Sequence, residues 1–198
     1  MQLRIIQLDE IQKKLMEIPP LINMYGEKDN SFFFSVENWL LKVEEILSNN
    51  RKVEVAQIAS LRSLLISAKR GIFPDNFFSK KSKSNRVLMD ITASSVLREA
   101  ENIITNSIRN DKIQFEEGER IARQLVLLGY KKGIIFSEKM TGSHENSISL
   151  IWQRLFSDNE TGNVASHLSG LVGLQDALII VDSIIEQLKY DIKKINEK

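Results

Sequence analysis

The apolar residues of the last 25 positions constrain the fold more than any other feature of this chain. The steps between them alternate strictly between four and three residues, giving the series Leu174, Leu178, Val181, Ile185, Leu188, Ile192 and Ile195. A repeat of about 3.5 residues places these side chains in one seam along a helix that packs against other helices. A helix over residues 174–198 would be roughly 35 Å long. We therefore predict an all-α fold with a long C-terminal helix.

Periodic apolar residues predict further amphipathic helices along the rest of the chain. Their approximate ranges are 3–18, 36–47, 53–70, 87–109, 114–130, 143–156 and 163–171. No segment alternates between apolar and polar residues clearly enough to predict a sheet. We expect a helical bundle of about six to eight helices, in a single domain over residues 1–198. Two sub-units, 1–130 and 143–198, joined by a linker over 131–142, are the alternative organisation.

Turn-forming and capping residues predict where the first helices begin and end. Pro19-Pro20 should end the first helix, because neither proline has an N–H to donate. The polar residues 23–31 should then form a loop, after which Ser35 caps the next helix. The link between the helices over 36–47 and 53–70 is short, so we expect these two to form an antiparallel hairpin.

Two matches to the capping-box pattern predict helix starts in the second half of the chain. Asp111 with Gln114, and Ser157 with Glu160, each place a short polar residue three positions before Glu or Gln. In this pattern the two side chains satisfy backbone N–H groups at the start of a helix. We therefore expect one helix to begin near residue 111 and another near residue 157.

The balance of charge favours no class of partner. Lys and Arg together number 27 against 26 Asp and Glu, so any attraction to nucleic acid or to a membrane would have to be local. The absence of cysteine excludes disulfides, thiolate nucleophiles and cysteine metal sites, and it fits a reducing compartment. The strongest apolar run, residues 171–185, is interrupted by glycine and aspartate, so we expect no membrane span. We therefore expect a cytoplasmic protein.

The two histidines, His144 and His167, are the candidate catalytic or metal-binding residues, since imidazole titrates near neutral pH and binds metals. No carboxylate stands three or four residues from either one, the spacing that places two ligands on one helix face. His144 fits a surface position at a helix start, and His167 fits a hydrogen-bonded packing position. We therefore expect no catalytic site, no metal and no cofactor.

The segment 71–86 is the candidate interaction surface. It contains Phe73, Phe77, Phe78, Lys80, Lys81, Lys83 and Arg86. Aromatic rings can stack on nucleic-acid bases while nearby cations neutralise phosphates. Buried aromatic residues and arginine are also frequent at the centres of protein interfaces. In a third interpretation the phenylalanines enter the core and the lysine-rich part is a solvated linker.

Three adjacent phenylalanines, Phe32, Phe33 and Phe34, form a second apolar segment. Consecutive side chains of a helix or strand point in different directions, so the three rings cannot all face one core. We expect one or two of them to fill a groove between helices or to contact a partner.

The C-terminal helix divides into two parts with different expected roles. Its first part has four additional apolar residues: Ala177, Ile179, Ile180 and Ile184. This part should therefore be apolar on nearly all sides and central in the bundle. Beyond it, Leu188, Ile192 and Ile195 form a narrow stripe flanked by lysines, and they are the candidate oligomer seam. The alternative is that the amphipathic helix over 3–18 covers this stripe within one chain.

These features lead to three hypotheses about function. The first is a non-enzymatic helical interaction protein, a scaffold or accessory subunit of a microbial cytoplasmic assembly, whose partner is another protein or a second copy of the chain. It follows from the seam and from the lack of a catalytic constellation. The second is a nucleic-acid-associated helical protein that uses residues 71–86. The third is an enzyme that uses His167 or His144.

Overall fold

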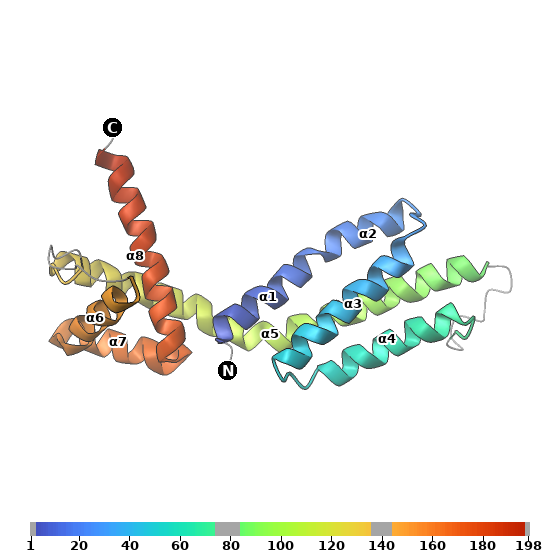
Figure 1. Ribbon diagram of the computed structural model, residues 1–198, viewed down its shortest axis with the longest axis horizontal. Coiled ribbons are helices and arrows are strands. Elements are labelled where there is room, and N and C mark those ends of the chain that lie inside the picture. The colour runs from blue at the N-terminus through green and yellow to red at the C-terminus, as the bar shows by residue number, and fades with distance from the viewer. Residues whose placement is uncertain (1–2, 74–83, 136–143, 197–198) are drawn as a thin grey trace. The chain divides into compact units, whose positions relative to one another are not determined.

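The computed structural model describes residues 3–73, 84–135 and 144–196, with their side chains except at 144–147, 192, 193, 195 and 196. Within these residues the chain forms eight helices and no strand, which confirms the predicted all-α fold. The helices are α1 (Arg4–Met16), α2 (Ile18–Gly26), α3 (Phe32–Asn49), α4 (Val55–Lys69), α5 (Asn85–Lys131), α6 (His144–Ser157), α7 (Asn159–Val172) and α8 (Leu174–Asn196) (Figure 1).

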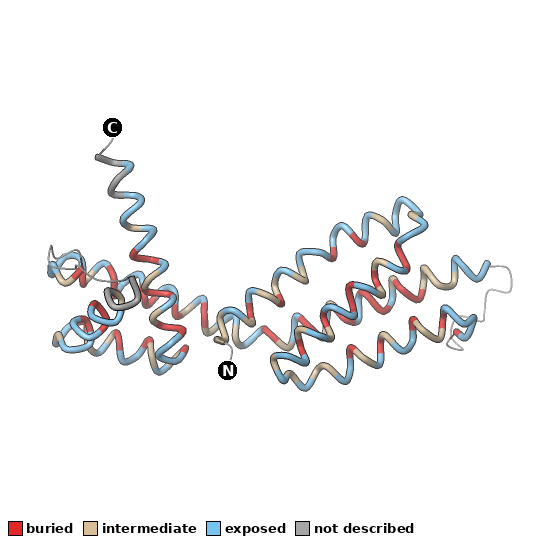
Figure 2. The backbone as a smooth tube through the Cα atoms, in the orientation of Figure 1, coloured by how far each residue is buried: buried red, intermediate tan, exposed pale blue. Residues whose placement is uncertain are grey.

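The chain divides into two compact units, and the division falls inside α5. The N-terminal unit contains residues 6–109. The C-terminal unit contains residues 110–198 together with residues 3–5 at the beginning of α1. The linker over 131–142 that the sequence offered as an alternative boundary lies later in the chain than this division. Each unit has its own set of buried apolar side chains (Figure 2).

The core of the N-terminal unit is built from apolar stripes that recur every seven residues. Leu40 and Leu47 of α3 are fully buried, as are Ile58 and Leu65 of α4. Residues seven positions apart lie on the same face of a helix, so one face of each helix enters the core. Burying one such side chain stabilises the fold by about 1.5–3 kcal/mol. The two helices lie side by side as the predicted hairpin (Figure 1).

Polar contacts join helices within the N-terminal unit. The Arg62 guanidinium of α4 donates to the Glu44 carboxylate of α3, with an Nε–Oε2 distance of 2.6 Å. The indole N–H of the buried Trp39 donates to the Lys14 carbonyl at the end of α1, at 3.0 Å. The second bond satisfies the only donor of a large buried side chain, so Trp39 fills the core without leaving a polar group unpaired.

The first helix ends at Met16, just before Pro19-Pro20, as predicted, but the two prolines also lie in the first turn of a second helix, α2, which was not predicted. Proline costs little there, since the N–H groups of the first turn have no partner within the helix. α2 continues to Gly26, so the loop is shorter than residues 23–31. α3 then begins at Phe32, which places Ser35 inside the helix rather than at its cap.

The three adjacent phenylalanines divide between core and surface. Phe32 and Phe33 are buried, whereas Phe34 is 51% exposed. The ammonium group of Lys69 lies 5.0 Å from the centre of the Phe34 ring, a cation–π contact between α4 and α3. The expectation that the three rings cannot share one core is confirmed.

The predicted break between helices over 87–109 and 114–130 does not occur, because α5 runs unbroken through both segments. No glycine or proline interrupts the chain between residues 109 and 114. Asp111 and Gln114 form no capping box; instead both accept hydrogen bonds from the guanidinium of Arg4, at 2.6 and 2.8 Å. The guanidinium also lies 5.6 Å from the centre of the Phe115 ring. The polar pattern is thus used for a contact with α1 rather than for a helix start.

The C-terminal unit packs α6, α7 and α8 with the second part of α5. Leu125, Leu155 and Leu168 are fully buried at its centre. Gly129 lets α5 approach closely, because a Cβ atom there would lie 2.6 Å from Cδ2 of Leu155. Real Cβ atoms essentially never come this close to another heavy atom. The absence of a side chain at Gly129 is therefore part of how this core is packed.

The first part of α8 enters this core with a broad face, as predicted, but it is not buried on all sides. Ala177, Val181 and Ile185 are almost completely buried, whereas Leu174 is 49% exposed and Ile179 is 37% exposed. The seam begins at the surface with Leu174, is half-buried at Leu178 and becomes fully buried at Val181. This part of α8 is therefore buried on one broad face, and not on nearly all sides as expected.

Membrane-spanning potential is limited to one bent pair of helices within the described ranges. No single helix there is long and apolar enough to cross a membrane. α7 and residues 174–191 of α8 meet the criteria of length and composition only together, with a bend of 118° between them.

Candidate binding cleft

The histidines predicted as candidate catalytic or metal-binding residues do not belong to a cluster of ligands. His167 lies on α7 and is exposed, so it does not occupy the packing position expected for it. His144 is the first residue of α6, and its side chain lies outside the described residues. Among the residues that the structure describes, no group of three His, Cys, Asp or Glu side chains is placed to hold a metal ion.

The candidate surface over 71–86 is described only at its two ends. Phe73 is buried, as the linker interpretation expects for the phenylalanines. Arg86 lies in the first turn of α5 and is exposed. Its guanidinium donates to the Lys28 carbonyl at 3.4 Å and lies 3.8 Å from the Asp90 carboxylate. The remaining members lie outside the described residues: Phe77, Phe78, Lys80, Lys81 and Lys83.

Arg86 belongs to a cleft of about 620 Å³ in the N-terminal unit, between α2 with the loop after it and the first turns of α5. The apolar side chains of its lining are Met24, Tyr25, Phe32, Val87 and Ile91. The polar residues of its lining are Lys28, Asp29, Asn30, Arg86 and Asp90. A concave, mostly apolar site of this size with a few polar groups is typical of ligand-binding pockets.

An aromatic pair forms one wall of the cleft. The rings of Tyr25 and Phe32 have centres 5.1 Å apart and are tilted by 50°. Phe32 is buried, whereas Tyr25 is 39% exposed, so the pair reaches from the core to the surface. Both rings also line a smaller pocket of about 200 Å³, which continues along α5 to Glu101.

The two carboxylates of the cleft have opposite electrostatic environments. The pKa of Asp29 is lowered, because its carboxylate accepts hydrogen bonds of 2.8 Å from both the backbone N–H and the hydroxyl of Ser31. The pKa of Asp90 is raised, because burial disfavours its charged form more than the charge of Arg86 favours it. Within the part of the chain that the structure describes, Asp90 is therefore the carboxylate of this cleft without a short polar contact.

The sequence identified Arg86 and Phe32 as candidate contact residues but not the cleft itself. Residues 23–31 were expected to form a loop. The sequence analysis therefore missed α2, which forms one side of the cleft. Tyr25 and Asp90 lie on segments about sixty residues apart in the sequence, so no local pattern predicts that they meet. The available signal was the apolar run after the two prolines, Leu21 to Tyr25, which can continue a helix that begins at a proline.

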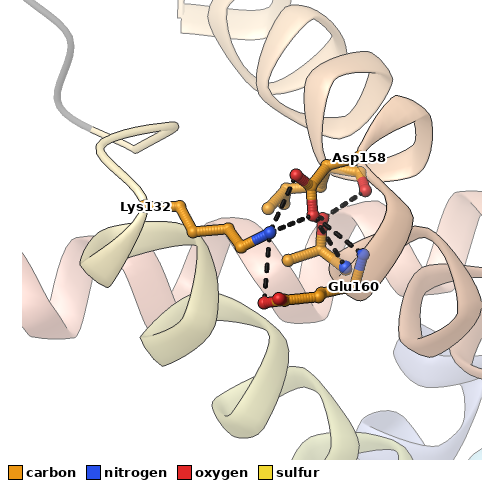
Figure 3. Close-up of polar contacts among 5 residues, drawn as sticks. Lys132, Asp158 and Glu160 are labelled. Atoms are coloured by element: carbon orange, nitrogen blue, oxygen red, sulfur yellow. Dashed lines mark hydrogen bonds and ion pairs between the residues drawn. The ribbon is translucent and has the colours of Figure 1, made fainter.

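A second polar cluster joins the end of α5 to the turn between α6 and α7 (Figure 3). Asp158 is the N-cap of α7, and its carboxylate accepts from the backbone N–H groups of Glu160 and Thr161, each at 3.0 Å. The ammonium group of Lys132 donates to both Asp158 oxygens, at 2.8 and 2.9 Å, and lies 3.1 Å from the Glu160 carboxylate. Ser157 with Glu160 therefore forms no capping box, because Asp158 provides the cap.

These contacts identify the Asp158 cluster as structural. The hydrogen bond from Lys132, followed by those of the α7 backbone, lowers the pKa of Asp158 from 3.8 to about 2. The same bond raises the pKa of Lys132. An ionised carboxylate and a protonated amine held in this way do not exchange protons near neutral pH.

Replacing Asp158 with asparagine is expected to reduce the loss of stability in acid. Because the pKa of Asp158 is lower in the folded chain, its contribution is fully present above about pH 4 and is lost as the pH falls to about 2. Urea unfolding at several pH values should show a smaller decrease in unfolding free energy between pH 4 and pH 2 for Asp158→Asn than for the unchanged protein. Glu119→Gln, at an exposed acid of the same unit, is the control. Equal decreases in all three proteins would contradict the assignment.

The C-terminal part of α8 lies beyond the buried part of its seam. The helix continues to Asn196, but Leu188 is half-buried and Tyr190 is 67% exposed. In Figure 1 this part of α8 extends past α6 and α7. The side chains of Ile192 and Ile195 lie outside the described residues.

One hydrogen bond bears on the alternative that α1 covers the stripe of Leu188, Ile192 and Ile195. The N–H of Ile5, near the beginning of α1, donates to the buried carboxylate of Asp176 at 3.3 Å. Asp176 lies in the first turn of α8. This hydrogen bond therefore lies at the opposite end of α8 from the candidate seam.

Compared with known proteins, the chain matches no protein family, no curated protein and no solved structure.

Proposed function

We propose that this chain is a non-enzymatic helical interaction protein, a scaffold or accessory subunit that associates with a second copy of itself through Leu188, Ile192 and Ile195. The observation that supports this most directly is the course of α8. Its seam is buried at Val181 and Ile185, but the helix continues for about three further turns, where Leu188 is only half-buried.

An apolar stripe of this kind would provide a driving force for association. Each isoleucine or leucine side chain fully removed from water contributes about 1.5–3 kcal/mol. Two copies of α8 that pair along their stripes would bury three such positions on each side. The steps of three and four residues between these positions are the spacing at which two helices keep their seams in contact.

The charges around the stripe are compatible with pairing between identical helices. Between residues 186 and 198 the sequence contains four lysines and three acidic residues: Lys189, Lys193, Lys194, Lys198, Glu186, Asp191 and Glu197. Because both signs are present along the same segment, two copies can place lysines opposite carboxylates. A segment of a single sign would repel its copy.

Sedimentation equilibrium over a range of concentrations tests this proposal. The unchanged protein is expected to show reversible association above its chain mass of 22.7 kDa. The double variant Ile192→Glu with Ile195→Glu should remain at the chain mass, because it places charges in the seam. Lys194→Gln, at an exposed position one residue from the seam, introduces no charge into the seam and should still associate above the chain mass.

Two results would count against the proposal. One is an unchanged protein that stays at 22.7 kDa at every concentration. The other is a double variant that associates as strongly as the unchanged protein. Circular dichroism of each variant shows whether its helical content is intact, so that unfolding is not mistaken for dissociation.

A further inference from the structure

We infer that the cleft between α2 and α5 binds an organic cation: an ammonium or guanidinium group carried on an apolar body, with the charge at Asp90 and the body against Tyr25 and Phe32. This site is independent of α8, and the inference does not require self-association.

The lining of the cleft is suited to an apolar body. Met24, Val87 and Ile91 face the same space as the aromatic pair. A volume of about 620 Å³ accepts a group considerably larger than water or a metal ion. Removing apolar surface of the ligand and of the exposed Tyr25 and Val87 side chains from water would favour binding.

The carboxylate of Asp90 is the polar group of the cleft that a ligand cation would stabilise most. Its side chain is only 21% exposed, so it is poorly solvated. Among the described residues, Arg86 provides the one ion pair to Asp90, and the distance of 3.8 Å is too long for a hydrogen bond. The guanidinium of Arg86 is directed instead to the Lys28 carbonyl at 3.4 Å. A ligand cation could therefore donate to Asp90 without displacing any short contact.

The other charges of the cleft are less available to a ligand. Asp29 already accepts two hydrogen bonds of 2.8 Å from Ser31. The side chain of Arg86 is 51% exposed and Lys28 is exposed as well, so water screens these two positive charges more than the charge of Asp90. A charged group attracts or repels a ligand more strongly when it is less exposed to water, because the effective dielectric constant around it is lower. In this cleft that group is a carboxylate, which selects a cation over an anion.

The aromatic wall adds to the same preference. The faces of aromatic rings carry partial negative charge, and cations within about 6 Å of a ring centre are attracted to it. Tyr25 and Phe32 line the same cleft as Asp90. A cation that enters the cleft thus meets a carboxylate and two aromatic rings, whereas a carboxylate ligand would meet an unfavourable potential from all three.

Three probes with one apolar body and different head groups test the inference: hexylammonium, hexanol and hexanoate. NMR titrations of the full chain at neutral pH and constant ionic strength would follow the side-chain signals of Tyr25, Phe32 and Ile91. Hexylammonium should bind roughly tenfold more tightly than hexanol, the ratio that corresponds to one additional charge-assisted hydrogen bond. Hexanoate should bind more weakly than hexanol.

Variants of Asp90 and of a control acid identify the residue responsible. Asp90→Asn should bind hexylammonium and hexanol equally, because the apolar lining remains while the charge is lost. Glu99→Gln, at an exposed acid on the same helix and outside the cleft lining, should keep the tenfold preference. Circular dichroism of each variant confirms that it is folded.

One further probe separates the two sources of such a cation. Nα-acetyl-lysine methylamide presents the butylammonium group of a lysine as a partner protein would. Tighter binding of this probe than of hexylammonium indicates a protein side chain, and the reverse order indicates a free amine; both support the inference. Equal affinity of hexylammonium and hexanol, preference for hexanoate, or no change in the three signals with any probe would overturn it.

Discussion

Replacing Lys112 with proline is expected to lower the free energy of unfolding by about 3 kcal/mol or more. In the continuous α5 helix, position 112 is deep inside the helix, far from either end. Proline there removes the backbone hydrogen bond to the carbonyl of Ile108, and its ring clashes with that carbonyl. Chemical denaturation followed by circular dichroism would measure the change.

The same substitution distinguishes the observed helix from the one predicted from the sequence. If Asp111 capped a new helix, Lys112 would be its first residue, where proline is favourable. A variant as stable as the unchanged protein would therefore indicate two helices with a break. Lys112→Ala is the control, with an expected change within about 0.5 kcal/mol, because the side chain is 55% exposed and its ion pair with Glu116 is 3.8 Å long.

The difference at Asp111 shows what local patterns can and cannot predict. A short acidic residue followed by glutamine three positions later has the same appearance at a helix start and in the middle of a helix. Which role it has depends here on Arg4, whose guanidinium lies 2.6 Å from Asp111 although 107 residues separate them in the sequence. A contact between residues this far apart in the sequence does not alter the spacing of apolar residues in either segment, so that spacing cannot predict it.

Most of the helices were predictable from their periodic apolar residues, with α2 as the exception. Apolar spacing predicted α3, α4 and the long α8, since hydrophobic periodicity reflects the face that enters the core, and the short link between α3 and α4 predicted their hairpin. Helix ends were less predictable. The two prolines after Ile18 follow the end of α1 and also lie in the first turn of α2, and only the first of these roles was predicted.

The candidate site was less predictable than the fold, because it depends on contacts between segments that are far apart in the sequence. Arg86 and Phe32 could be identified as residues of interest by type alone. The cleft requires in addition that α2 exists and that it lies beside the first turns of α5. The role given to Asp90 depends on its burial and on a distance of 3.8 Å to Arg86, and neither is a property of local sequence.

Replacing Leu155 with alanine is expected to lower the free energy of unfolding by about 2–5 kcal/mol. Leu155 is completely buried in the C-terminal unit, and its Cδ2 atom occupies the space that a side chain at position 129 would need. Truncation removes these contacts and leaves a cavity, because helices that approach closely at a glycine have little freedom to move inward. Urea denaturation at neutral pH would give the difference.

Leu150 offers a matched control for this prediction, since it is the same residue type on the same helix. It is 50% exposed, so Leu150→Ala should change the free energy of unfolding by less than about 1 kcal/mol. Both variants change helix propensity and side-chain volume equally, so the difference between them measures burial alone. Similar losses at the two positions would mean that α6 does not pack its Leu155 face against Gly129 of α5, and the core assigned to the C-terminal unit would be incorrect.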